Sequence, residues 1–205
     1  MTYRLKLAVV ACTIAPLVAC SSGPSAPDES VYVDGLVEAR ADKDTFLLEG
    51  PDSPVPPEMR DTLLPLPYYP VDQGYAVPAS LSLSDDRPVF EMPTSTGATR
   101  RMQLVGVLEF SLLGDSRSLG AFVPEGTQRI TSLFVPFADL TTGDSTYSAG
   151  RYLDIDTTTT GYYTIDFNQA YNPYCAYNDA YECPYPPPPN RLNALVLAGE
   201  QAPEG

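Results

Sequence analysis

The middle of the chain alternates apolar and polar residues with a period of two, the pattern of a strand with one face in a core. The clearest run is RRMQLVGVLEFSLLG, residues 100–114. Glu109 and Ser111 are predicted to point away from the core, and Gly114 with Asp115 marks a turn into a second strand over 117–123. The positions predicted to share the core face are Met102, Leu104, Leu108, Phe110 and Leu112.

Later segments repeat this alternation. ITSLFVPF (130–137) places apolar residues at Leu133, Val135 and Phe137. RYLDID (151–156) and YYTIDFN (162–168) are predicted to pair as a hairpin, and 192–198 is a possible final strand. The hairpin's predicted core face is Leu153, Ile155, Tyr163, Ile165 and Phe167, and its other face is Tyr152, Asp154, Thr164 and Asp166.

The N-terminal part has a different pattern. Asp34 is a candidate cap for a helix from Gly35 to about Leu48, Pro51–Pro57 interrupts the chain, and 58–64 predicts one or two further helical turns. The 22 prolines disfavour long helices elsewhere. We therefore expect a mainly β (α+β) fold: an antiparallel β-barrel or sandwich with an N-terminal helix, in one globular domain over 34–200, followed by a tail over 201–205.

The first residues have the order of a bacterial lipoprotein signal. A short basic stretch and an apolar stretch end in Leu17-Val18-Ala19-Cys20, followed by small polar residues. This resembles a lipobox, which implies a signal peptide over 1–19, acylation (palmitate) of Cys20 and a flexible tether over 20–33. The alternative is an ordinary cleaved signal. The lipoprotein interpretation predicts an extracytoplasmic protein anchored in the outer membrane or at the cell surface, depending on the envelope of the host.

The cysteines agree with that compartment. Of the four cysteines, Cys12 lies in the predicted signal and Cys20 is the predicted lipid site, which leaves Cys175 and Cys183. Two remaining cysteines in an oxidising compartment predict a disulfide between them. Zinc ligation and a catalytic thiolate are disfavoured because no second cysteine pair and no histidine exist.

Charge and composition exclude several functions. The formal charge of −14 disfavours nucleic-acid binding. The lack of histidine removes the commonest general base and metal ligand, and no phosphate-binding glycine motif is present. We expect no metal and no cofactor.

Long stretches of the chain are similar to one family. They are LPYYPVD (66–72), PTSTGATRR (93–101), LFVPFADLTTGDSTYSAGRYLD (133–154) and DFNQAYNPYCAYNDAYECPYPPPPNRL (166–192). From about Arg40 to Glu200 the chain resembles the bacterial and archaeal domain of unknown function 1684 family. The resemblance implies a compact, mostly β domain and no established activity. The chain departs from the family pattern at Ala138, Ser145 and Pro189, which weighs against a carboxylate-centred active site at those positions.

Polar residues gather in the family-like stretches. They could form a buried network that ties the C-terminal segment to the sheet, or a pocket in which arginines hold an anionic group and Asp166 or Glu109 acts as base. The candidate pocket residues are Arg100, Arg101, Arg151, Asp166, Asn168, Tyr171, Asn172, Asn190 and Arg191.

The C-terminal tyrosines also allow two interpretations. Tyr171, Tyr174, Tyr177, Tyr181 and Tyr185 have helical spacing, but the flanking prolines permit only a short helix near 175–181. Their rings either pack on the sheet or form an aromatic wall for a ligand such as a sugar or lipid. We therefore expect a lipid-anchored module that binds a ligand or an envelope component. The alternatives are a histidine-free enzyme using an Arg/Asp/Asn/Tyr pocket and a structural envelope protein.

Overall fold

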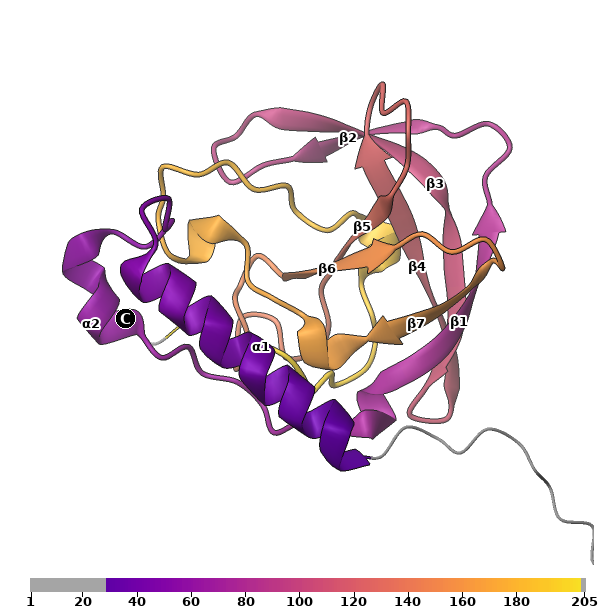
Figure 1. Cartoon of the computed structure of the whole chain (residues 1–205). Helices are drawn as coiled ribbons and strands as arrows, with labels where there is room; N and C mark the ends of the chain where they lie inside the picture. The colour runs from indigo at the N-terminus through magenta and orange to yellow at the C-terminus, as the bar shows by residue number, and fades with distance from the viewer. Residues whose placement is uncertain (1–28, 204–205) are drawn as a thin grey trace, which may run out of the picture.

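The computed structural model describes residues 29–203, so the predicted signal peptide, Cys20 and most of the predicted tether lie outside the described part. A seven-stranded antiparallel sheet curls into a nearly closed barrel, with strand order β6-β5-β4-β3-β1-β7 and β2 paired to β3 (Figure 1). The strands are β1 Ala76–Leu83, β2 Val89–Pro93, β3 Thr99–Leu112, β4 Asp115–Pro124, β5 Ser132–Phe137, β6 Arg151–Asp156 and β7 Tyr162–Asp166. The expected antiparallel β fold is confirmed, and of the two predicted forms, barrel and sandwich, the structure has the barrel.

The inward faces of the strands form one core. The predicted core positions of β5 are confirmed, since Leu133, Val135 and Phe137 are all fully buried. The predicted core positions of 153–167 are confirmed as well, because all belong to the same buried cluster: Leu153, Ile155, Tyr163, Ile165 and Phe167. Alternation placed these side chains correctly because the barrel has a single apolar interior.

The long strand β3 carries a bulge that the alternation did not indicate. Its register with β4 shifts between Leu104 and Gly106. Leu108 and the following even positions enter the main core, whereas Met102 packs with Met92 and Phe122 in a separate cluster. The single face predicted for 102–112 is therefore wrong, because an extra residue reverses the side-chain alternation.

The predicted hairpin of β6 and β7 is also wrong. Among the described residues, these two strands are the two ends of the sheet and do not pair with each other. The segment after β7 crosses to β6 instead, where Tyr152 and Tyr171 exchange backbone hydrogen bonds of 2.9 and 3.0 Å. The barrel is thus left with a seam between β6 and β7.

One long helix, α1 (Glu29–Glu49), lies along the outside of the barrel (Figure 1). It begins before the predicted start, so Asp34 lies inside the helix and is not its cap. Only Leu36 and Leu47 of this helix are buried. Polar side chains supply much of its attachment: Tyr32, Arg40, Lys43 and Asp44 all bond to barrel or loop residues. The predicted turns over 58–64 form as the 3₁₀ turn η1 (Pro57–Met59) and α2 (Arg60–Leu63).

The C-terminal region is irregular but ordered. Cys175 and Cys183 form a disulfide, as predicted, and a 3₁₀ turn, η4 (Tyr174–Ala176), stands where a short helix was expected. The other 3₁₀ turns are η2 (Gln73–Tyr75), η3 (Phe167–Gln169) and η5 (Pro188–Asn190). Residues 192–198 alternate between buried and exposed but form no strand, which corrects that prediction. The carbonyls of Val196 and Ala198 accept hydrogen bonds from Arg151 rather than from a neighbouring strand.

Candidate functional site

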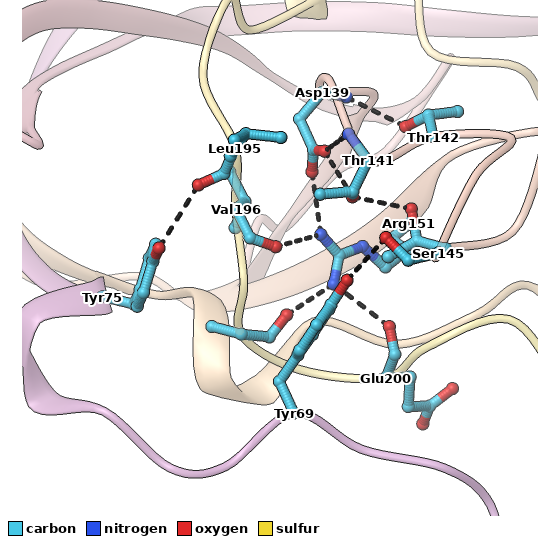
Figure 2. Close-up of polar contacts among 12 residues, drawn as sticks. Tyr69, Tyr75, Asp139, Thr141, Thr142, Ser145, Arg151, Leu195, Val196 and Glu200 are labelled. Carbon is cyan, nitrogen blue, oxygen red and sulfur yellow. Dashed lines mark hydrogen bonds and ion pairs between the residues drawn. The ribbon is translucent and has the colours of Figure 1, made fainter.

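Arg151 lies at the start of β6 with its side chain only 1% exposed. One terminal nitrogen, Nη2, donates to Asp139 Oδ2 at 2.8 Å and to the Val196 carbonyl at 3.0 Å (Figure 2). The other, Nη1, donates to the carbonyls of Ala198 and Glu200. Burial lowers the pKa of Arg151, and the Asp139 carboxylate opposes that shift. Both terminal nitrogens are therefore committed to tying 196–200 to the barrel.

Asp166 and Asn168 fasten α1 to the end of β7. Asp166 accepts from the Tyr32 hydroxyl at 2.9 Å and from the Asn168 backbone N–H at 3.0 Å. The Asn168 side chain holds Asp72, accepting from its N–H at 3.0 Å and donating to its carbonyl at 2.8 Å. Asp166 is 8% exposed and Asn168 is 2% exposed. These two candidates are thus buried and bonded to their surroundings.

The two candidate asparagines of the C-terminal region are buried as well. Asn190 bonds both backbone groups of Gly120 and the Pro136 carbonyl, at 2.7–2.9 Å. The Asn172 side chain donates to the Gln201 carbonyl at 2.8 Å. These contacts hold the C-terminal segments against the barrel.

Glu200 is a buried acid that the sequence did not single out. Its carboxylate pairs with Lys43 of α1, and it also accepts from the Tyr177 hydroxyl at 2.9 Å and the Asn172 N–H at 2.7 Å. Tyr68 pairs with it through the backbone. Its position as the last residue of the family-like region was the only sequence signal available.

The remaining candidate arginines are exposed and lie apart. Arg101 forms surface ion pairs with Glu125 and Glu91. Arg191 lines a different surface cavity, together with Glu109. Arg100 donates to the Glu182 carbonyl at 2.9 Å. The structure therefore does not bring the predicted polar residues into one pocket.

A surface groove of about 640 Å³ runs between α1, the outer face of β5 and β6, and the disulfide-linked C-terminal region; we call it the aromatic groove. Four charged residues line it: Lys43, Arg100, Asp154 and Glu182. Its aromatic lining consists of Phe46, Phe134, Tyr152, Tyr171, Tyr174 and Tyr181. Of the predicted candidates, Arg100 and Tyr171 lie here.

Contacts between the rings shape this groove. Tyr152 meets Phe134 and Tyr171 edge-to-face, with ring centroids 4.7 and 5.8 Å apart. The rings of Tyr174 and Tyr181 meet edge-to-face with centroids 5.2 Å apart; Tyr174 directly precedes Cys175, and Tyr181 lies inside the loop that the disulfide closes. Edge-to-face pairs and a covalent staple hold the rings in fixed positions. The lining is therefore preorganised.

One hydrogen bond links the rings to the acidic side of the groove. The Tyr171 hydroxyl donates to Asp154 Oδ2 at 2.6 Å. Burial, followed by this bond and the Asp154 charge, raises the pKa of Tyr171, so the phenol stays protonated as a donor. Asp154 keeps its other oxygen for a further donor.

The predicted tyrosines divide between the two interpretations. Tyr177 is 2% exposed and packs in a buried cluster with Leu47 of α1, whereas Tyr174 is 43% exposed at the groove.

Within 29–203, no group of three or more potential metal-binding Cys, His, Asp or Glu side chains is present. None of the helices in that range is long and apolar enough to cross a membrane.

The fold and site thus define a class: a small antiparallel β-barrel with one helix packed on its outside and an aromatic surface groove. The chain belongs to the family described as "Protein of unknown function (DUF1684)", whose model matches residues 62–201. It is also similar to the solution NMR structure of an uncharacterized protein of Haloarcula marismortui, at 39% identity and a TM-score of 0.66. That match covers 84% of this chain and 95% of the other. The comparison with curated proteins found no match.

Proposed function

We propose that this chain is a lipid-anchored, extracytoplasmic binding protein whose aromatic groove takes a sugar-bearing component of the cell envelope. The observation that carries the binding function is the groove itself, where fixed rings stand beside carboxylates and cationic side chains. Concave sites lined by aromatic residues with a few convergent polar groups are the usual form of a ligand site. The lipobox-like LVAC at 17–20 supports the anchor.

The lining favours a sugar over a lipid chain. Aromatic faces offer apolar area to the C–H face of a sugar ring, while Asp154 and Glu182 offer acceptors for its hydroxyls. An acyl chain would withdraw the charged groups of Asp154, Glu182 and Arg100 from water and offer them no hydrogen bond in exchange, which is costly. Arg100 already donates to the Glu182 carbonyl and lies 3.6 Å from the Glu182 carboxylate, but both side chains are exposed and can also contact a ligand.

The direct test is native mass spectrometry of the mature protein purified from its own host in mild detergent. We expect a retained, sugar-bearing mass that is lost on denaturation. Protein that is repeatedly empty would contradict the proposal and favour a structural envelope protein. That alternative fits the finding that most of the predicted pocket residues are buried and hydrogen-bonded within the protein.

Variants test whether the groove is the site. Tyr174→Ala removes a ring that is 43% exposed at the groove and should lower affinity for the retained ligand about 3- to 10-fold, the worth of one aromatic contact. Tyr162→Ala is the matched control, because Tyr162 is 74% exposed and lies outside the groove. Equal affinities of the two variants would place the ligand elsewhere.

The anchor is tested separately, by metabolic labelling with a fatty-acid analogue. Wild-type protein should be labelled and Cys20→Ala should not. Absence of label from both proteins would contradict the anchor without affecting the proposal for the groove.

A further inference from the structure

A second, smaller cavity of about 230 Å³ lies between α1 and the barrel; we call it the α1 pocket. Arg40 and Lys43 line it from successive turns of α1, and Tyr68 and Glu200 line it from the barrel side. It shares Lys43 and Tyr171 with the aromatic groove, so the two cavities are neighbours.

Two buried polar atoms of this pocket's lining residues have no hydrogen-bond partner in the described part of the chain. They are Nε of Arg40 and the hydroxyl oxygen of Tyr68. The other two guanidinium nitrogens of Arg40 are occupied, by the carbonyls of Tyr69 at 3.0 Å and Asn168 at 3.2 Å. The guanidinium carbon also lies 4.5 Å from the centre of the Tyr68 ring, which brings the two residues into contact. A buried donor without a partner is costly, so two such donors on contacting residues that line one cavity indicate that an acceptor belongs there.

The charges around the pocket indicate the kind of acceptor. Glu200 is already neutralised by Lys43 and bonded by Tyr177 and Asn172. Arg40 has only neutral carbonyl partners, and in 29–203 it forms no ion pair. Burial lowers the pKa of Arg40, and the nearby carboxylates of Glu200 and Asp166 only partly oppose this shift.

We propose that the α1 pocket binds a small oxyanion group, a carboxylate or a phosphate, with Arg40 Nε and the Tyr68 hydroxyl as donors. An ionised oxygen accepts a stronger hydrogen bond than water does and would give Arg40 a charged hydrogen-bond partner in place of its neutral ones. The group is either a free ion or the acidic end of a larger molecule. In both cases the pocket recognises the same chemistry.

The test follows the Nε–H resonances of the arginines by NMR in the full-length chain. Sodium acetate and sodium phosphate are titrated separately, and sodium chloride controls for ionic strength. The Arg40 resonance should shift saturably with acetate, phosphate or both, and not with chloride. The resonance of Arg151, whose terminal nitrogens are bonded internally, is the internal reference and should stay in place.

Matched variants locate the binding. Tyr68→Phe should weaken binding of the active probe about tenfold, the equivalent of one lost charge-assisted hydrogen bond. It should not lower the thermal midpoint in anion-free buffer, because it removes a hydroxyl with no partner. Tyr75→Phe is the control, since that hydroxyl bonds the Leu195 carbonyl away from the pocket, and its affinity should equal that of wild type.

Three results would overturn the proposal. They are an Arg40 resonance that responds to neither acetate nor phosphate, a Tyr68→Phe protein that binds as tightly as wild type, and cross-relaxation of the Arg40 Nε–H with water that the anions leave unchanged. The last result would identify the cavity as a hydration site. Phosphate binding without acetate binding, or the reverse, identifies which oxyanion the pocket takes.

Discussion

A charged side chain inside a protein has to be neutralised and hydrogen-bonded, and Arg151 meets both conditions. Its partners are one carboxylate and three carbonyls from a segment that forms no strand. Carbonyls that a neighbouring strand would have bonded are thereby satisfied by a side chain. The sequence placed Arg151 only among the candidate pocket residues, because its three carbonyl partners lie 45, 47 and 49 residues further along the chain.

We predict that Arg151→Met destabilises the fold by about 3–5 kcal/mol, because it leaves a buried carboxylate and several carbonyls without a partner. Arg101→Met is the control: its ion pairs are exposed, so the change should be below about 1 kcal/mol. Urea unfolding followed by circular dichroism measures both. Similar losses in the two variants would contradict a structural role specific to Arg151.

Asp44 provides a test with pH. Burial raises the pKa of this carboxyl, and the hydrogen bond from the Leu66 N–H opposes the shift. A carboxyl whose pKa is raised on folding destabilises the fold when it is ionised, so the penalty is absent below its unfolded pKa and fully present above its folded pKa.

We therefore expect Asp44→Asn, which keeps an oxygen acceptor, to be slightly more stable than wild type at pH 7, by less than about 1 kcal/mol because the site is partly exposed. Near pH 3 the two proteins should be equally stable, since the carboxyl is then protonated in both states. Urea midpoints across this range are the measurement. A variant less stable than wild type at pH 7 would show that the charge of Asp44 is favourable.

At the scale of elements, alternation found the strands whose inner face meets one core, and it failed where a neighbour changes the geometry. The bulge at Gly106 and the seam between β6 and β7 depend on pairing partners that local pattern does not contain. The helix start was misplaced because Tyr32 is fixed by Asp166, a residue far along the chain. The aromatic groove was anticipated only as a set of tyrosines, since its other wall comes from α1.

The docking of α1 gives the next prediction. Leu47 is fully buried in a cluster with Val55, Leu63 and Leu66, whereas its neighbour Leu48 is 41% exposed. Leu47→Ala should cost about 2–5 kcal/mol of unfolding free energy, and Leu48→Ala about 0.5 kcal/mol or less. Thermal and urea unfolding of the pair checks this. Equal costs would mean that α1 is held by its polar contacts alone.

At the scale of the whole molecule, the formal charge is −14, and five of the ten lysines and arginines in 29–203 form ion pairs with acids. Excess like charge destabilises a compact state through self-repulsion, and salt screens it. The fold class was predictable because it follows from pattern and composition. The arrangement of the buried polar residues was not, because each bond joins segments far apart in the sequence.

We predict that the urea midpoint rises between about 10 mM and about 0.5 M sodium chloride, as the Debye length falls from about 30 Å to about 4 Å. A matched series with Arg101→Met, which removes a surface cation, should show a larger rise. A midpoint that falls with salt would mean that the ion pairs outweigh the net repulsion.

The attachments of α1 also determine when the fold is complete. Tyr32 bonds a residue 134 positions away, and Lys43 bonds one 157 positions away. In the chain α1 precedes every strand of the barrel and Glu200 follows them all, so the bond of Lys43 to Glu200 forms only after the barrel has been made. Contacts of such high sequence separation make closure slow. The contacts of α1 with 55–66 are local, whereas its bonds to Asp166 and Glu200 join the two ends of the domain, so these bonds are expected to form late in folding.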